Sequence, residues 1–360
     1  MKIHIISDDI QRFEDLRENW HAVYSADPNT TVFLSWAWLR GWIAATPYKW
    51  IVLAAQTMPG SPYVAFMIVG MHHAEINGRP QVILYMGGNP FSYHTGFICL
   101  PEHAEKALPA LATFIKNTLN WHIFHLKEVT DPRLDFFLKC FGRMKFQIRE
   151  YDKTPWVYIP LPETVEHYVE KMLGSKTRQE LKRRTRLIEN LKEFHISHLD
   201  GDSIHSGIET LLGLWQAQWG EQSEETLNMF RSLFMYCFKN DLLVSRILWD
   251  GNVPIAGSIS FIDRQKKYKV ASLNVFNGSY HKFSPGSVMC LLSIRYAIEQ
   301  GLRVFDLGVH NKTYKYSFGG HEGLNRNVMI SNIGYMKNLR RQLKIRTRIR
   351  NLLGVLKDKG

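Results

Sequence analysis

The run Ser284-Pro285-Gly286-Ser287 could bind a phosphorylated ligand at the start of a helix. It supplies a hydroxyl cap, a proline tolerated in the first helical turn, and a glycine that lets a bulky group approach the backbone. First-turn amides have no partner inside the helix, and the helix dipole makes that end positive. This end therefore suits a pyrophosphate, and His281 and Lys282, just upstream, could add charge.

A second polar cluster follows the strand predicted at 303–308, which contains Asp306. Beyond the strand come His310, Tyr314 and Lys315, in a polar run that continues to residue 320. Carboxylate, imidazole, phenol and ammonium groups can move protons or stabilise developing charge. Polar groups crowded past a strand end indicate a site.

The surrounding elements explain how these residues could be positioned. Alternating apolar residues and a D-G turn predict an antiparallel meander, with strands at 244–249, 254–262 and 268–276. The next segment, 288–300, is apolar nearly all round and ends at Gly301, which indicates a helix buried against a sheet. The predicted order is three strands, a buried helix and one more strand.

These residues resemble a known family. The string Tyr280-His281-Lys282-Phe283-Ser284-Pro285-Gly286, followed by Phe305-Asp306-Leu307-Gly308 and Tyr314-Lys315, is similar to the C-terminal half of the Fem-like branch of the GNAT acyltransferases. More narrowly, it resembles the double-GNAT group labelled CelD/BcsL-like, named for an association with cellulose biosynthesis. Residues 175–189 resemble the basic helix that opens the second half in that group, and residues 33–42 resemble its aromatic segment near the N-terminus. Together the matches span about residues 30 to 330.

The resemblance implies an α+β (mixed α/β) fold with two tandem GNAT-like (acyl-CoA N-acyltransferase) domains, each a mostly antiparallel sheet flanked by helices. The first half repeats the order strands, helix, strand, with strands predicted at 51–56, 63–70, 81–86 and 122–126 and a helix at 102–119. We expect domains at 1–160 and 161–335 and a basic tail at 336–360. A proline-rich hinge is expected at 154–162.

The resemblance also implies the donor, which is acetyl-CoA or another acyl-CoA, with no metal. Segments 273–276 and 304–307 would splay apart, and the thioester would lie between them. Six residues would bind coenzyme A: His281, Lys282, Phe283, Ser284, Gly286 and Ser287. In the first half the corresponding helix opens with Pro101-Glu102-His103, whose glutamate would repel a pyrophosphate. Coenzyme A is therefore expected only in the second half.

Four residues are candidates for the chemistry by resemblance. Asp306 would bind the acceptor or act as base, although it could instead cap the following turn. Lys315 could neutralise the oxyanion or be an ordinary surface lysine. Tyr314 could protonate the leaving thiolate or be a packed aromatic residue. His310 is a weaker base candidate, since it could simply be exposed.

The acceptor is expected near the loop 87–96, where Asn89, Tyr93 and His94 would bind it. Lys176, Arg178 and Arg183 could form a basic rim that attracts an anionic acceptor or the 3′-phosphate of the donor; the alternative is a solvated helix face. Tryptophans can stack on sugar rings, but Trp215 and Trp219, four residues apart on a helical pattern with leucines, are predicted to lie in the core.

Composition limits the remaining possibilities. The chain has 360 residues and a net charge of +12, with nine Lys or Arg and one Asp from 337 to 360. This tail could lie on an anionic membrane or form a loosely docked helix. The four cysteines are far apart, which argues against a disulfide framework or zinc site. The N-terminus predicts no signal peptide, and no apolar run reaches the ~18 residues of a membrane span.

These observations together predict a cytoplasmic acyl-CoA-dependent N-acyltransferase, with the tail at the inner face of the membrane as an option. Its acceptor would be an amino or hydroxyl group of an amino sugar or glycan precursor in polysaccharide or cell-envelope biosynthesis. One alternative is a Fem-like aminoacyl-tRNA-dependent transferase, although no base-reading motif supports tRNA binding. Another is a non-catalytic module that recruits polysaccharide machinery. The acceptor, the acyl length and the oligomeric state stay open.

Overall fold

The computed structural model describes residues 1–333 except 77, 79 and 143. The first half contains β1 (Lys2–Ser7), α1 (Ile10–Glu14), α2 (Arg17–Ala26), α3 (Trp36–Ala45), β2 (Lys49–Gln56), β3 (Tyr63–Glu75), β4 (Pro80–Met86), β5 (Ile98–Cys99), α4 (Ala104–Thr118), β6 (Ile123–Val129) and α5 (Leu134–Leu138). A long strand, β7 (Phe146–Pro160), leads into the second half. The predicted tail at 336–360 lies outside the described residues.

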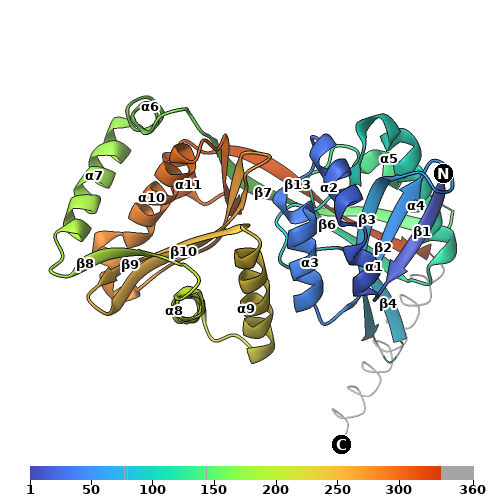
Figure 1. The fold of residues 1–360 in the computed structure, drawn as a ribbon, viewed down its shortest axis with the longest axis horizontal. Helices are drawn as coiled ribbons and strands as arrows, with labels where there is room; N and C mark the ends of the chain where they lie inside the picture. Colours follow the sequence, from blue (N-terminus) through green and yellow to red (C-terminus); the bar gives the residue numbers. More distant parts are fainter. Residues whose placement is uncertain (77, 79, 143, 334–360) are drawn as a thin grey trace, which may run out of the picture.

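The second half contains α6 (Val165–His167), α7 (Ser175–Glu189), β8 (Phe194–His198), α8 (Ile204–Trp219), α9 (Glu224–Lys239), β9 (Leu243–Asp250), β10 (Val253–Asp263), β11 (Tyr268–Phe276), α10 (Pro285–Glu299), β12 (Val304–Val309), α11 (Thr313–Ser317) and β13 (His321–Asn332). Figure 1 shows α7 and α10 on one side of this half's sheet and α8 and α9 on the other. No helix within the described residues is long and apolar enough to span a bilayer.

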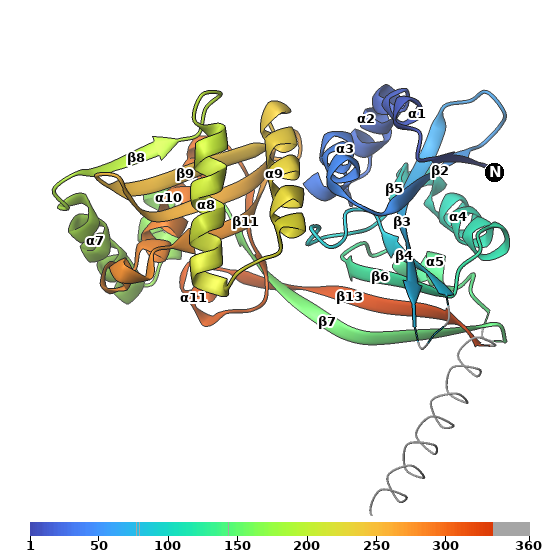
Figure 2. The same ribbon diagram turned by 90° about the horizontal axis from the view of Figure 1, so that it is seen from below.

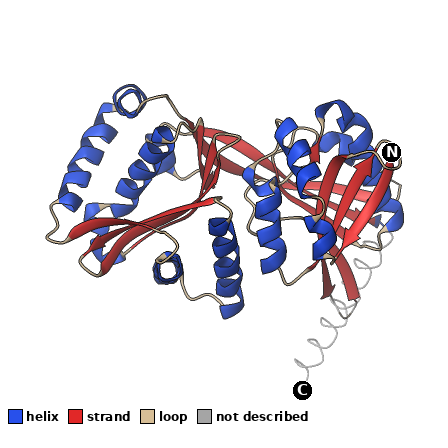
Figure 3. Ribbon diagram, in the orientation of Figure 1, coloured by secondary structure: helices blue, strands red, loops and turns tan. Residues whose placement is uncertain are grey.

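The two halves repeat one arrangement. In each, three antiparallel strands are followed by a helix and a strand that pairs in parallel with the third, so that β4 pairs with β6 and β11 with β12. Helices flank the mostly antiparallel strands in both halves (Figure 3). The predicted fold class and the internal repeat are therefore confirmed.

The described strands form one continuous sheet because β7 and β13 pair with both halves. Its order is β1-β2-β3-β4-β6-β13-β7-β12-β11-β10-β9-β8, with β5 beside β3. Figure 2 shows β7 and β13 running side by side from one half to the other. The prediction of a hinge at 154–162 was wrong, since residues 154–160 belong to the strand β7. The domain bounds themselves stay a prediction.

A shared core also joins the halves. Helices α2 and α3 of the first half and α8 and α9 of the second half contribute to the same cluster of buried apolar side chains. Helices α3 and α9 approach closely at Gly41, where a Cβ atom would lie 3.0 Å from the Tyr236 ring. The opposite face of the first-half sheet is covered by α4 and α5.

Helix α10 is buried nearly all round, as its sequence predicts. Its apolar residues pack against the sheet and against α7, which explains why it lacks a polar stripe. The helix begins after Ser284, which has left-handed backbone angles (φ 50°), and Pro285 occupies the first turn. Gly301 follows the helix with φ 66°, which confirms the predicted glycine cap.

Candidate functional site

The site is created where β11 and β12 separate. The two strands are paired over only three residues, and the last pair joins Val270 to Asp306. Beyond it, β11 continues along β10 as far as Phe276, whereas β12 continues along β7 with an irregularity between Asp306 and Val309. The backbones of 271–276 and 307–309 are therefore not paired with each other. The resemblance implied a separation at 273–276 and 304–307, but residues 304–306 pair with 268–270, so β12 leaves β11 only from residue 307.

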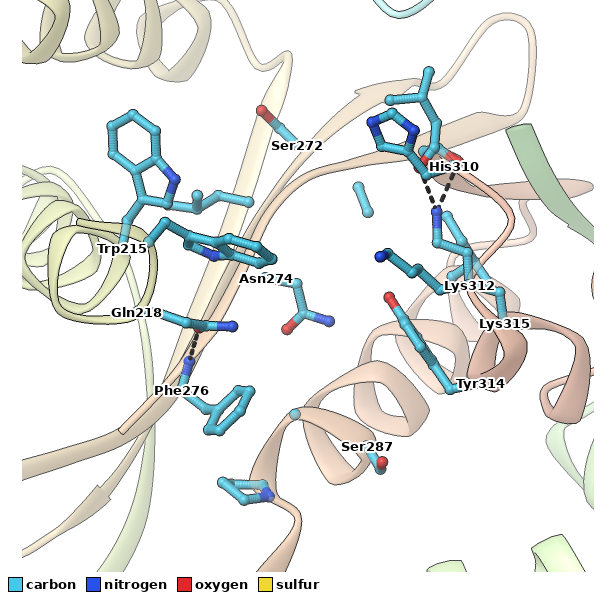
Figure 4. A pocket seen from close by; sticks show the side chains of 18 of the residues that line it. Trp215, Gln218, Ser272, Asn274, Phe276, Ser287, His310, Lys312, Tyr314 and Lys315 are labelled. Carbon is cyan, nitrogen blue, oxygen red and sulfur yellow. Dashed lines mark hydrogen bonds between the residues drawn. The ribbon is translucent and has the colours of Figure 1, made fainter. Parts of the chain in front are cut away.

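A cavity of about 770 Å³ occupies this gap (Figure 4). One wall is formed by β11 residues between Ala271 and Phe276, together with the end of α8. The opposite wall is formed by residues 307–310 and by α11. The start of α10 closes the lower end as drawn in Figure 4, where Ser287 is labelled. A sheet opened beside a helix N-terminus can hold an extended ligand with an anionic end.

The predicted coenzyme A residues divide into two groups. His281, Ser284, Gly286 and Ser287 line the cavity at the start of α10. Lys282 and Phe283 form the second group and do not line the cavity. The Lys282 ammonium lies 4.9 Å from the ring centroid of Phe283, which packs beside a buried cluster that includes residues of α10. The positive end of this 15-residue helix therefore lies at the cavity, where the Ser287 amide donates to the Ser284 carbonyl at 3.0 Å.

Tyr314 and Lys315 lie on the opposite wall. The Tyr314 side chain is 46% exposed, and its partial burial raises the pKa of the phenol to about 12, above an ordinary tyrosine value that already leaves it protonated at neutral pH. Burial lowers the pKa of Lys315 to about 8. The Lys315 ammonium donates to the carbonyls of Gly308 and Val309 at 2.8 Å each and so fixes the bend that ends β12. It is therefore not an ordinary surface lysine.

His310 and Asp306 differ in access to the cavity. His310 lines it, is exposed, and has left-handed backbone angles (φ 69°). Asp306 is fully buried and is not among the lining residues. Its carboxylate accepts from the Gly308 amide (2.6 Å) and the Tyr268 hydroxyl (2.6 Å), and His94 Nε2 lies 2.5 Å from it. The sequence singled out Asp306 and His94 separately, and the structure brings them together.

The other first-half candidates also lie at different depths. Tyr93 lines the cavity, and its hydroxyl donates to the Ser272 carbonyl at 2.9 Å. Burial raises the pKa of Tyr93 to about 12. Asn89 is buried outside the cavity, where its carbonyl accepts from Trp42 Nε1. Only one of the three loop residues therefore reaches the cavity.

The basic residues of α7 line two neighbouring grooves. Lys176 and Arg183 line a groove of about 550 Å³ that shares Ser287 and Tyr314 with the main cavity. Arg183 is paired with Glu180, which lowers the pKa of that carboxyl to about 2. Arg178 lines a separate groove and donates to the Glu170 carbonyl. Of the three predicted basic residues, Lys176 and Arg183 therefore line the groove that adjoins the cavity, as Arg184 also does, and Arg178 does not.

The sequence analysis missed one wall of the cavity. Trp215, Gln218 and Trp219 line it from α8, and Trp219 is 66% exposed. The prediction that Trp219 lies in the core was therefore wrong, because α8 ends at this residue and its last turn passes the edge of the core. Asn274 lines the same wall from β11. Within the described residues, no cluster of three or more His, Cys, Asp or Glu could hold a metal.

Residues 175–316 match the acetyltransferase (GNAT) domain family. The match covers β11, α10, β12 and most of α11, and so contains nearly all of the cavity. It confirms the prediction of an enzyme of the GNAT N-acyltransferase class, and a GNAT domain implies an acyl-CoA donor. No curated protein matches the chain in sequence.

Solved structures with the same fold cover almost the whole chain. FemX aligns with a TM-score of 0.64 at 10% identity, over 91% of this chain and 97% of its own. A conserved protein of unknown function from Bacteroides thetaiotaomicron VPI-5482 has a TM-score of 0.56 at 13% identity, over 92% and 100% of the two chains. L-PGS from Bacillus licheniformis has a TM-score of 0.54 at 8% identity, over 90% and 92%. At these identities the likeness shows the fold alone.

Proposed function

We propose that the protein transfers an acyl group, with acetyl as first choice, from coenzyme A to the amine of an amino sugar or related glycan precursor. One observation carries the donor half of this proposal: β11 and β12 part beside the N-terminus of α10 and leave a cavity of about 770 Å³. The glycan acceptor follows from the resemblance to the CelD/BcsL-like group, and the cytoplasmic site of action follows from the widely spaced cysteines and the N-terminal sequence.

The donor would lie with its pyrophosphate at the start of α10, beside Ser284, Gly286 and Ser287. His281 adds an imidazole there, and Lys176 and Arg183 border the neighbouring groove that an adjacent phosphate could reach. The pantetheine arm would run between 271–276 and 307–309, whose backbones are not paired with each other. The thioester would then lie within reach of Tyr314.

In the transfer, the acceptor nitrogen forms a bond to the acyl carbon, and the bond from that carbon to sulfur breaks. The acceptor nitrogen loses a proton, for which His310 is the lining imidazole. The leaving thiolate takes a proton from the Tyr314 phenol, which lines the cavity and is protonated at neutral pH. Lys315 places positive charge on the same wall. Asp306 is assigned a positioning role, because it holds the Gly308 amide and does not reach the cavity.

Calorimetric titration of acetyl-CoA and longer acyl-CoAs into the purified protein tests the donor site. Gly286→Glu adds a carboxylate and bulk at the helix start and should abolish binding. Gly286→Ala is the matched control: its Cβ would lie 3.3 Å from one edge carbon of the Phe276 ring, and we expect binding to be retained. Equal binding by wild type and Gly286→Glu would refute this donor site.

Failure of every acyl-CoA to bind would favour the other two hypotheses. A Fem-like enzyme that uses aminoacyl-tRNA is consistent with the shared fold of FemX and with the basic α7 helix. It would require tRNA binding that Lys176→Glu and Arg183→Glu weaken. A recruitment module would depend on residues 339–360, so deletion of this segment would remove its activity, whereas an enzyme would keep its turnover.

A further inference from the structure

Trp219 is a large aromatic side chain that remains 66% exposed while lining the main cavity. Exposing an indole forgoes the stabilisation that its burial would give, so an exposed tryptophan in a concave site indicates a ligand. The indole lies in the last turn of α8, directly before Gly220, whose φ of 94° ends the helix.

Asn274 provides a second and independent indication. Its Oδ1 atom is shielded from solvent, has no hydrogen-bond partner among the residues that the structure describes, and belongs to a side chain that lines the same cavity. Buried amide oxygens are normally hydrogen-bonded, so this oxygen is suited to accept a bond from a bound molecule. Figure 4 shows Asn274 on the same side of the cavity as Trp215 and Gln218, across from Tyr314 and Lys312.

The wall around these two residues is held in place. The Gln218 amide oxygen accepts from the Phe276 backbone amide at 3.2 Å, which ties the end of α8 to β11. Trp215 packs edge-on against Phe230, with 5.0 Å between ring centroids. The aromatic wall is therefore preformed, which reduces the entropy lost when a ligand binds.

Charge narrows the class of ligand further. Among the described residues that line the cavity none is Asp or Glu, whereas Lys312 and Lys315 are cationic. A polyamine or lysine-like acceptor carries extra positive charge that would be repelled here. A purely apolar amine would leave the Asn274 oxygen unpaired. A sugar ring meets the three conditions set by this wall: it has an apolar face for the Trp219 indole, a hydroxyl group for the Asn274 oxygen, and no second positive charge beside the lysines.

We propose that Trp219, Trp215 and Asn274 form the acceptor subsite of the enzyme and that it takes a pyranose ring. One face of the sugar stacks on the Trp219 indole, and a hydroxyl or amino group on its rim donates to Asn274 Oδ1. The inference rests on the proposed acyl transfer and adds the place and chemistry of acceptor recognition. The acceptor enters from the α8 side, opposite Tyr314.

The test compares two amino sugars with a cyclic amine that lacks hydroxyl groups and with a linear diamine, with acetyl-CoA as donor and thiol release as readout. Glucosamine and chitobiose should be acetylated at least about tenfold more efficiently than cyclohexylamine, which lacks hydroxyl groups, and than cadaverine, which is dicationic. Asn274→Leu should remove the preference for glucosamine over cyclohexylamine, because it removes the amide acceptor while keeping the side-chain size.

Variants of Trp219 show whether its indole contacts the acceptor or the donor. Trp219→Ala should raise the KM for glucosamine about tenfold and leave the calorimetric Kd for acetyl-CoA within about twofold, while Trp219→Phe should retain most of the affinity. Trp249→Ala is the matched control, since Trp249 stacks on His195 away from the cavity. It should leave both constants unchanged.

Three results would overturn the assignment. Loss of acetyl-CoA affinity in Trp219→Ala with an unchanged KM for glucosamine would mean that the indole contacts the donor. Preference for cyclohexylamine would exclude the sugar class, as would a wild-type protein that binds acetyl-CoA but acetylates neither sugar. Failure of acetyl-CoA to bind at all is a different result, because it refutes the proposed function itself.

Discussion

At the scale of single residues, Lys269 is a buried cation that has no carboxylate beside it in the described part of the chain. Its side chain is 2% exposed, its ammonium donates to the Ser293 carbonyl at 3.1 Å, and it lies 4.1 Å from the ring centroid of Phe305. Burial, and then the positive charge of Arg246, lower the pKa of Lys269 to about 7. Keeping this lysine charged therefore costs free energy in the folded state.

This lysine predicts a rise in stability with pH. Between about pH 7 and the ordinary lysine value of 10.5, the unfolded chain holds the Lys269 proton and the folded chain does not. The contribution of Lys269 to stability therefore increases with pH through this window. Lys269→Met should remove the increase, so that from pH 7.5 to 9.5 the wild type gains about 2 kcal/mol more in free energy of unfolding than the variant.

Urea unfolding at the two pH values measures this difference. Lys239→Met, at an exposed position of α9, is the control and should keep the pH dependence of the wild type. Parallel pH curves for wild type and Lys269→Met would show that the buried lysine does not titrate in this range.

The sequence predicted the chemical candidates better than their contacts. Residues 304–307, His310, Tyr314 and Lys315 were singled out from local pattern and resemblance, and the last four of these, from Leu307 on, line one cavity. The partnership of His94 with Asp306 could not be predicted, because 212 residues separate them and only the folded chain brings them to 2.5 Å. The exposure of Trp219 was hidden for a related reason: helical periodicity does not show where a helix passes the edge of the core.

At the scale of elements, β13 completes the first half of the molecule. It pairs with β6 from Arg326 to Ser331, and its Val328 and Ile330 side chains lie in the core under α4 and α5. This strand follows all of the second half in sequence. A fragment that ends before residue 321 would therefore leave β6 and this core without their last strand.

Two residues on β13 provide a matched test of this contribution. Ile330 is fully buried, whereas Leu324 on the same strand is 54% exposed. Ile330→Ala should lower the free energy of unfolding by roughly 2–5 kcal/mol, because it leaves a cavity in the core. Leu324→Ala should change it by about 0.5 kcal/mol or less. Equal losses in urea unfolding would show that β13 adds little to the first-half core.

Local sequence signals predicted most of the elements but not this pairing. The three-strand meander, α10 and its glycine cap follow from neighbouring residues, and the structure confirms them. The hinge was predicted because Pro155, Pro160 and Pro162 suggested a break in the chain. Pro155 is accommodated in β7 because a proline still offers its carbonyl, and here that carbonyl accepts from the His310 amide at 2.7 Å. Such long-range partners leave no local pattern.

At the scale of the whole molecule, the halves are joined by more than the sheet. The Tyr24 hydroxyl of the first half bonds the Asp263 carboxylate of the second, and the Lys266 ammonium donates to the Asp27 carbonyl at 2.8 Å. Tyr93 reaches across to Ser272, and α3 packs on α9. The cavity is therefore built from both halves, and separating them would remove Tyr93 from its wall.

This construction predicts that the two halves unfold together. Hydrogen exchange measured by mass spectrometry along a urea series should give α4 and α10 the same midpoint, because opening either half would expose the shared core and break the pairing of β13. Ile330→Ala, although it lies in the first-half core, should lower both midpoints equally, and Leu324→Ala should lower neither. A midpoint for α10 that stays at the wild-type value in Ile330→Ala would instead mean that the acyl-CoA half is stable by itself, and that the first half contributes only the loop that carries Tyr93.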